Sequence, residues 1–129
     1  MDLNNRIQQV LAQHGGIRMA ILFGSLAKGC ATPQSDLDLA IQMDAPLTAE
    51  AKMALIGELS QAIGRPVDLI DLRVAGEPLL GQILKHGARL LGSDSDYAEL
   101  LKRHLFEEAD FMPYRRRILA ERRQAWIGK

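Results

Sequence analysis

The sequence predicts an α+β fold, in which helices cover a small mixed β-sheet and a helical tail follows at the C-terminus. Short runs of apolar and β-branched residues, bounded by glycine and proline, are typical of strands. Longer segments carry apolar residues every three or four positions, which is typical of amphipathic helices. The expected order is helix, strand, strand, helix, strand, helix, strand, helix, helix. This order favours a sheet covered mainly on one face.

The first half of the chain is expected to form two helices and two strands. Residues 2–14 show helical spacing and stop at Gly15, since glycine commonly ends a helix. Thr48 can cap the second helix, which Gly64 ends. The two strands are expected at Ile17–Phe23 and Asp36–Met43.

The second half is expected to add two strands and three helices. The strands are Val67–Leu72 and the shorter Ala88–Leu91. One helix starts near Pro78 and stops at Gly87, a second runs from Ser93 to about Asp110, and a third follows Pro113 as far as Trp126. We expect residues 1–92 to form the core and residues 93–129 to form the helical tail of the same domain, as a surface for a partner or a second copy.

Composition excludes several classes of function. The 129 residues suit one domain with its own core, and their formal net charge of zero gives no sign of direct nucleic-acid binding. No apolar run is long enough to span a membrane, and the N-terminus lacks the pattern of a signal peptide. The single cysteine, Cys30, allows no internal disulfide and fits a reducing compartment, so we expect a cytoplasmic protein.

One stretch contains the residues with the clearest chemical role. Gly24-Ser25 follows the first strand, and Asp36 and Asp38 come after ten intervening residues. Residues i and i+2 of a strand share a face, so these two carboxylates are expected to lie side by side. Such a pair suits Mg²⁺, which takes oxygen ligands from one or two carboxylates and substrate phosphates. A glycine at a strand-to-helix turn lets a phosphate approach the backbone N–H groups.

A third carboxylate is available on the next strand. Asp68 and Asp71 differ by three positions and therefore face opposite sides, so only one can join the first two acids. Asp68 stands among apolar residues, where a metal or a cation would offset the cost of burying its charge. Alternatively, Asp68 begins the strand and contacts only water.

The spacing Gly24-Ser25-x10-Asp36-x-Asp38 resembles the signature of nucleotidyltransferases of the DNA polymerase beta type, over about residues 17–91. The short chain is similar to the minimal nucleotidyltransferases, the MNT group, and the resemblance implies the nucleotidyltransferase fold. In this family a third acid on the next central strand completes the metal site, and it maps to Asp68. The resemblance thus implies that Asp36, Asp38 and Asp68 are catalytic and hold two Mg²⁺ ions, with ATP as the substrate.

Four residues are candidates for nucleotide binding. Gly24 and Ser25 would hold the triphosphate, although a serine here also suits a helix N-cap. Lys28, one helical turn further on, could reach a phosphate or remain a solvated surface charge. Ser35 could touch phosphate, or could serve the turn beside Pro33.

The tail is divided by charge. Residues 94–110 hold six acids and residues 111–129 hold six Lys or Arg. This asymmetry favours an interaction surface, although the two segments could instead pair with each other. RNA contact by the arginines is the least favoured interpretation, because no aromatic platform accompanies them.

The resemblance also implies a partner. Several MNT proteins are antitoxins that transfer AMP to a tyrosine of a cognate HEPN-domain toxin, and the chain is too short to hold an acceptor domain of its own. Two alternatives are a small-molecule nucleotidyltransferase of the aminoglycoside type, working as a homo-oligomer, and a non-catalytic antitoxin that occludes its toxin. The sequence leaves open the base, the acceptor, the number of AMP groups and the oligomeric state.

Overall fold

The fold is built on a four-stranded mixed sheet in the order β3-β2-β1-β4. A computed structural model of the chain describes residues 2–109. Strand β1 (Ile17–Phe23) runs antiparallel to β2 (Leu37–Met43) and to β4 (Ala88–Leu91), whereas β2 runs parallel to β3 (Val67–Asp71). The α+β fold with a small mixed sheet is therefore confirmed.

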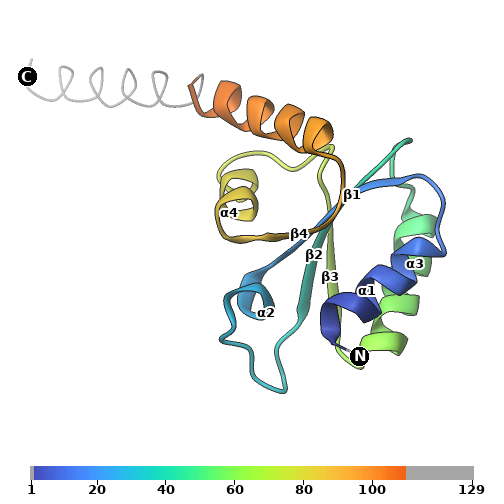
Figure 1. The fold of residues 1–129 in the computed structure, drawn as a ribbon. Coiled ribbons are helices and arrows are strands. Elements are labelled where there is room, and N and C mark those ends of the chain that lie inside the picture. Colours follow the sequence, from blue (N-terminus) through green and yellow to red (C-terminus); the bar gives the residue numbers. More distant parts are fainter. Residues whose placement is uncertain (1, 110–129) are drawn as a thin grey trace, which may run out of the picture.

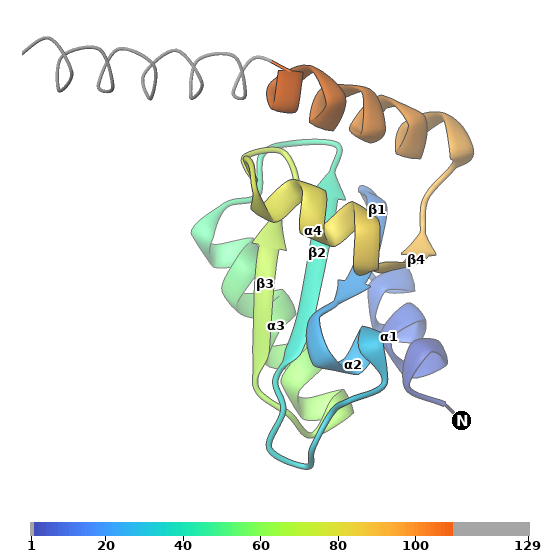
Figure 2. The same cartoon turned by 90° about the vertical axis from the view of Figure 1, so that its left-hand side faces the viewer.

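Helices cover the sheet on both faces (Figure 1). Helices α1 (Leu3–Ala12) and α3 (Ala49–Ile63) lie on one side, and α2 (Gly24–Lys28) and α4 (Leu79–His86) lie on the other (Figure 2). A further helix, residues 94–109, lies across the α4 side at one end of the sheet. No helix among residues 2–109 is long and apolar enough to cross a membrane.

The expectation that the helices cover mainly one face is wrong, and β1 shows why. Residues 19–22 of this strand are all buried, so successive side chains need cover on opposite sides of the sheet. Ala20 and Leu22 pack in a core with α1 and α3, whereas Met19 and Ile21 pack in a second core with α4. The helical spacing in the sequence does not say which face each helix covers.

The helices begin and end as the sequence indicates, within two residues. Asp2 caps α1 by accepting a hydrogen bond from the N–H of Asn5 at 2.8 Å. Thr48 caps α3 through the N–H of Ala51 at 3.1 Å, and α3 ends at Gly64 with φ of 77°. These hydrogen bonds satisfy backbone groups that have no partner inside a helix.

The helix of residues 94–109 packs on the core. Leu100 is only 4% exposed, and the guanidinium of Arg103 donates hydrogen bonds to the carbonyl oxygens of Leu72 and Ala75 at 2.6 and 2.9 Å. Ser93 accepts a hydrogen bond from the N–H of Asp96 at 3.1 Å, as an N-cap does. This helix was expected at nearly these bounds; the helix expected as far as Trp126 and the basic segment lie outside the described residues.

We expect Leu100→Ala to lower the free energy of unfolding by about 2–5 kcal/mol, because it opens a cavity between this helix and the core. Leu105→Ala on the same helix is the matched control, since that side chain is 62% exposed, and its cost should stay within about 0.5 kcal/mol. Urea denaturation of the two variants measures the difference. Equal costs would contradict the packing of this helix on the core.

Candidate active site

The end of β1 and the starts of β2 and β3 lie side by side at the same end of the sheet. Strand β1 ends at Phe23, which is the register partner of Asp38 near the start of antiparallel β2. Asp38 is in turn the register partner of Asp68 on parallel β3. Neighbouring strands lie about 4.8 Å apart, so this register places the two aspartates side by side. The β-pairing thus brings together residues 30 positions apart in the sequence.

The two aspartates also share a face of the sheet. Side chains two positions apart on a strand point the same way, and Ala40 and Ile70 belong to the core beneath α4. Asp38 and Asp68 therefore lie on the α2 and α4 side. Asp71 lies on the opposite side, where its carboxylate accepts a hydrogen bond from the N–H of Arg73 at 3.0 Å. The geometry brings Asp68, and not Asp71, to Asp38.

Gly24 brings the backbone against the Asp38 carboxylate. Its φ of 73° lies in the left-handed region that favours glycine. A Cβ at this position would overlap Oδ2 of Asp38 and would lie 2.9 Å from its Cγ. Any side chain here would thus displace the carboxylate or the turn. Both the backbone conformation and the lack of space therefore require glycine at position 24, the first residue of the expected signature.

The carboxylate of Asp38 sits in a negative environment. Partial burial raises the pKa of Asp38 above its ordinary value, and the negative charges of Asp68 and Asp36 raise this pKa further. Both of the other predicted acids therefore act electrostatically on Asp38. A cation placed among them would relieve this repulsion.

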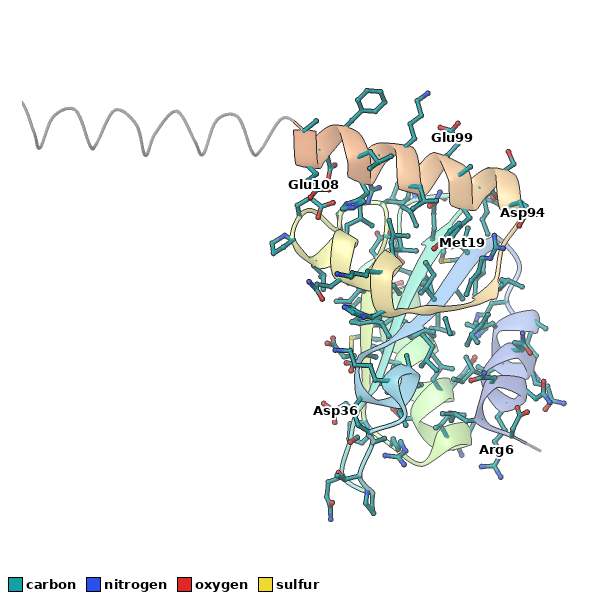
Figure 3. All side chains as sticks on the ribbon, turned by 60° about the vertical axis from the view of Figure 1, so that its left-hand side comes forward. Arg6, Met19, Asp36, Asp94, Glu99 and Glu108 are labelled. Atoms are coloured by element: carbon teal, nitrogen blue, oxygen red, sulfur yellow. The ribbon has the colours of Figure 1, made fainter. Side chains whose placement is uncertain are left out.

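Asp36 reaches the site from a loop. We expected it to begin the second strand, but β2 starts one residue later, at Leu37. Figure 3 shows Asp36 at the foot of α2, far from the helix of residues 94–109. Its backbone is held by the segment before β3: the N–H of Leu37 donates to the carbonyl of Pro66 at 2.8 Å, and the guanidinium of Arg65 donates to the carbonyl of Ser35 at 2.9 Å. No sequence pattern indicates this role for Arg65, because its partners lie 30 or more positions away.

The other residues predicted to bind the nucleotide, Ser25, Lys28 and Ser35, lie on α2 and in the loop that follows it. Ser25 lies in the first turn of α2, whose N-cap, Phe23, provides no side-chain hydrogen bond to the helix. Lys28 is exposed in the last turn of α2. The Ser35 hydroxyl accepts a hydrogen bond from the N–H of Thr32 at 2.8 Å, so it serves its own turn, which is the alternative considered for it.

The acids fit a hard divalent cation by their chemistry. Carboxylate oxygens are ligands that Mg²⁺ prefers, and the negative charges of Asp36 and Asp68 both act on the Asp38 carboxylate. In residues 2–109, as the side chains stand, no three His, Cys, Asp or Glu residues converge closely enough to hold a metal ion. A bound ion would therefore need the acidic side chains to turn toward a common point.

A comparison with known protein families identifies the class to which this fold and these residues belong. Residues 5–96, more than half of the chain, match the family described as polymerase beta, nucleotidyltransferase. The chain belongs to this nucleotidyltransferase family. The match includes the glycine-serine turn and all three acids.

The chain is also similar to individual proteins of known structure or activity. The chain is 34% identical over 80 residues to the protein adenylyltransferase MntA of Shewanella oneidensis, a match that covers 62% of this chain and 58% of that protein's length. It is similar to a chain of a toxin–antitoxin crystal structure with AMP-PNP, at 26% identity and a TM-score of 0.82 over 93% of this chain and 98% of that one. It is also similar to a chain in the structure of a tri-AMPylated Shewanella oneidensis HEPN toxin in complex with its MNT antitoxin, at 25% identity and a TM-score of 0.75 over 92% and 93% of the two chains.

Gly24→Ala should destabilise the protein more than Gly29→Ala. The two glycines have nearly equal φ, 73° and 75°, so both variants carry the strain of a left-handed alanine. A Cβ on Gly29 meets nothing within 4 Å, whereas one on Gly24 overlaps Asp38. We expect an additional loss of about 1–3 kcal/mol at Gly24, measured by urea denaturation. Equal losses would show that Asp38 does not lie against this turn.

Asp38→Asn should stabilise the metal-free protein at neutral pH. Because the pKa of Asp38 is raised in the folded state, the folded chain still holds a proton that the unfolded chain has lost at pH values between the two pKa values. Stability therefore falls as pH rises from the ordinary pKa of aspartate through the raised one, and the variant escapes this loss. Unfolding with a chelator present should show the variant as the more stable protein at pH 7, with the advantage vanishing below the ordinary aspartate pKa. A less stable variant at pH 7 would contradict the electrostatics described above.

Proposed function

We propose that this chain is a protein adenylyltransferase that transfers AMP from ATP to a tyrosine of a cognate HEPN toxin and thereby acts as its antitoxin. The observation that carries the proposal is the position of the Asp38 carboxylate, against the Gly24 backbone and beside Asp68. A phosphate-binding turn next to paired carboxylates suits nucleotide transfer. The similarity to MntA and to chains of toxin–antitoxin structures supports the choice of acceptor.

In the proposed reaction, the tyrosine oxygen attacks the α-phosphorus of ATP. The bond from this phosphorus to the oxygen bridging the α- and β-phosphates breaks, and pyrophosphate leaves. Phosphoryl transfer depends on positioning and on charge neutralisation, and it needs no nucleophile from the enzyme. Gly24 and Ser25 would hold the leaving phosphates for in-line attack, and Lys28 is free to approach them from the surface. Asp68 would accept the proton of the attacking hydroxyl.

Magnesium is part of this proposal. Asp36, Asp38 and Asp68 would hold two Mg²⁺ ions, whose positive charge would offset the repulsion that Asp36 and Asp68 exert on Asp38. When bound, such ions neutralise the charge that develops on the attacking and leaving oxygens. Ser35 accepts a hydrogen bond from the N–H of Thr32, and its hydroxyl proton would remain able to donate to a phosphate.

The toxin would dock at the tail, residues 93–129. On the helix of residues 94–109, Leu105 and Phe106 are each 62% exposed, and they line an apolar groove with Ala98 and Leu101. Apolar and aromatic side chains of this kind are enriched in the cores of protein interfaces. A second copy of the chain is the other occupant that such a face would suit. We place the reaction in the cytoplasm, where the exposed thiol of Cys30 stays reduced, and assign no membrane or nucleic-acid partner.

The direct test is to incubate the chain with a cognate HEPN partner, ATP and Mg²⁺. The partner, which the family resemblance implies is an RNase, should gain AMP on a tyrosine, measured by mass spectrometry, and lose its RNase activity. The added negative charge would repel RNA phosphates, so the loss should persist after this chain is removed. Asp36→Asn with Asp38→Asn should reduce transfer at least about 100-fold, because the charge of the transferred group is then unbalanced.

Asp68→Ala and Asp71→Ala provide the matched pair for this test, since the two acids lie on opposite faces of one strand. The first should abolish transfer and leave some nucleotide binding, and the second should leave transfer largely intact. The reverse pattern would overturn the assignment of the third acid.

Two outcomes would replace the proposed function. If the double variant neutralises the toxin as well as the parent does, with no mass change on the partner, the chain acts by occlusion. If the parent instead transfers AMP to free aminoglycosides without a partner, it is a small-molecule nucleotidyltransferase.

A further inference from the structure

The backbone on both sides of Asp36 is held by a single dipeptide, Arg65-Pro66. Nη1 of Arg65 donates hydrogen bonds to the carbonyl oxygens of Thr32 and Ser35 at 2.8 and 2.9 Å. The carbonyl of Pro66 accepts the hydrogen bond from the N–H of Leu37 at 2.8 Å. Asp36 itself is exposed, so packing contributes little to its position.

These contacts restrain the two dihedral angles that aim the Asp36 side chain. The carbonyl of Ser35 belongs to the peptide bond before Asp36, and the N–H of Leu37 belongs to the peptide bond after it. Peptide bonds are planar, so two restrained peptide planes leave φ and ψ of the residue between them little freedom. Arg65-Pro66 also leads directly into β3 and Asp68, which fixes Asp36 relative to the third acid.

The turn before Asp36 depends on the same guanidinium. The N–H of Ser35 donates to the carbonyl of Thr32 at 3.0 Å, and the hydroxyl of Ser35 accepts from the N–H of Thr32. Arg65 binds both carbonyls of this turn from one nitrogen. The rest of the loop, residues 29–34, is exposed. Without Arg65, the turn would keep its internal hydrogen bonds and lose its attachment to the core.

We infer that Arg65 is a positioning residue, which holds Asp36 where the carboxylate can join Asp38 and Asp68 around a divalent cation. The inference rests on the proposed function, because it concerns the same acids. Outer residues that orient metal ligands typically change metal affinity by about 10- to 100-fold when they are replaced. We expect a loss in this range when Arg65 can no longer donate.

The test compares Arg65→Met, which keeps a long side chain and removes every donor, with Arg65→Lys, which keeps a charged nitrogen able to donate both bonds. Each variant is titrated with Mg²⁺ at a fixed concentration of AMP-PNP, and binding is followed by calorimetry. Arg65→Met should need about 10- to 100-fold more Mg²⁺ than the parent, and Arg65→Lys should recover most of the loss. Hydrogen exchange of residues 30–37 should rise in Arg65→Met before any nucleotide is added.

Arg103→Met is the matched control for loss of stability. Arg103 also donates to backbone carbonyls, those of Leu72, Arg73 and Ala75 at the far end of the sheet, so its replacement should lower the melting temperature without changing the Mg²⁺ requirement. The inference is overturned if Arg65→Met binds with the parent's Mg²⁺ requirement, if Arg103→Met raises the requirement equally, or if Arg65→Lys is no better than Arg65→Met. A parent that binds Mg²⁺ and AMP-PNP but transfers no AMP to a HEPN partner would reject the proposed function and leave this test intact.

Discussion

The site depends on holding three negatively charged carboxylates together at one end of a small sheet. Asp38 is at the centre: its carboxylate touches the Gly24 turn, and the charges of Asp36 and Asp68 raise its pKa. Repulsion of this kind favours any rearrangement that separates the acids. Asp38 and Asp68 stay together because the strands that carry them are part of a buried core, and Arg65-Pro66 holds the loop that carries Asp36. The core must offset the unfavourable electrostatics of the three acids.

The strand order of the sheet brings the residues of the sequence pattern together in one site. Antiparallel β1 and β2 place the glycine turn beside Asp38, and parallel β2 and β3 place Asp68 on its other side. Apolar side chains anchor the strands from both faces, with Leu39 and Leu69 in one core and Ala40 and Ile70 contributing to the other. The two-sided burial leaves these strands no freedom to slip, because a shift of one residue would bury Asp38 and expose leucine.

The sequence predicted much of this arrangement and missed specific parts for physical reasons. Alternation along a strand correctly separated Asp68 from Asp71, because side-chain direction is a local property. The cover on both faces was missed, since helical periodicity shows that a helix has an apolar side and not which layer it packs on. Asp36 was placed in the strand and lies before it, which reflects the usual uncertainty of strand ends. Arg65 was not singled out, because its role comes from carbonyl groups that only folding brings within reach.

The proposed function requires Asp36, Asp38 and Asp68 together to bind the metal that accompanies the nucleotide. Crystals grown with Mn²⁺ and AMP-PNP test it most directly, because anomalous scattering locates the manganese. We expect manganese within coordination distance of carboxylate oxygens from all three residues, with the phosphates against the turn that begins at Gly24. Manganese bound only to phosphate, or to Asp71 in place of Asp68, would contradict it.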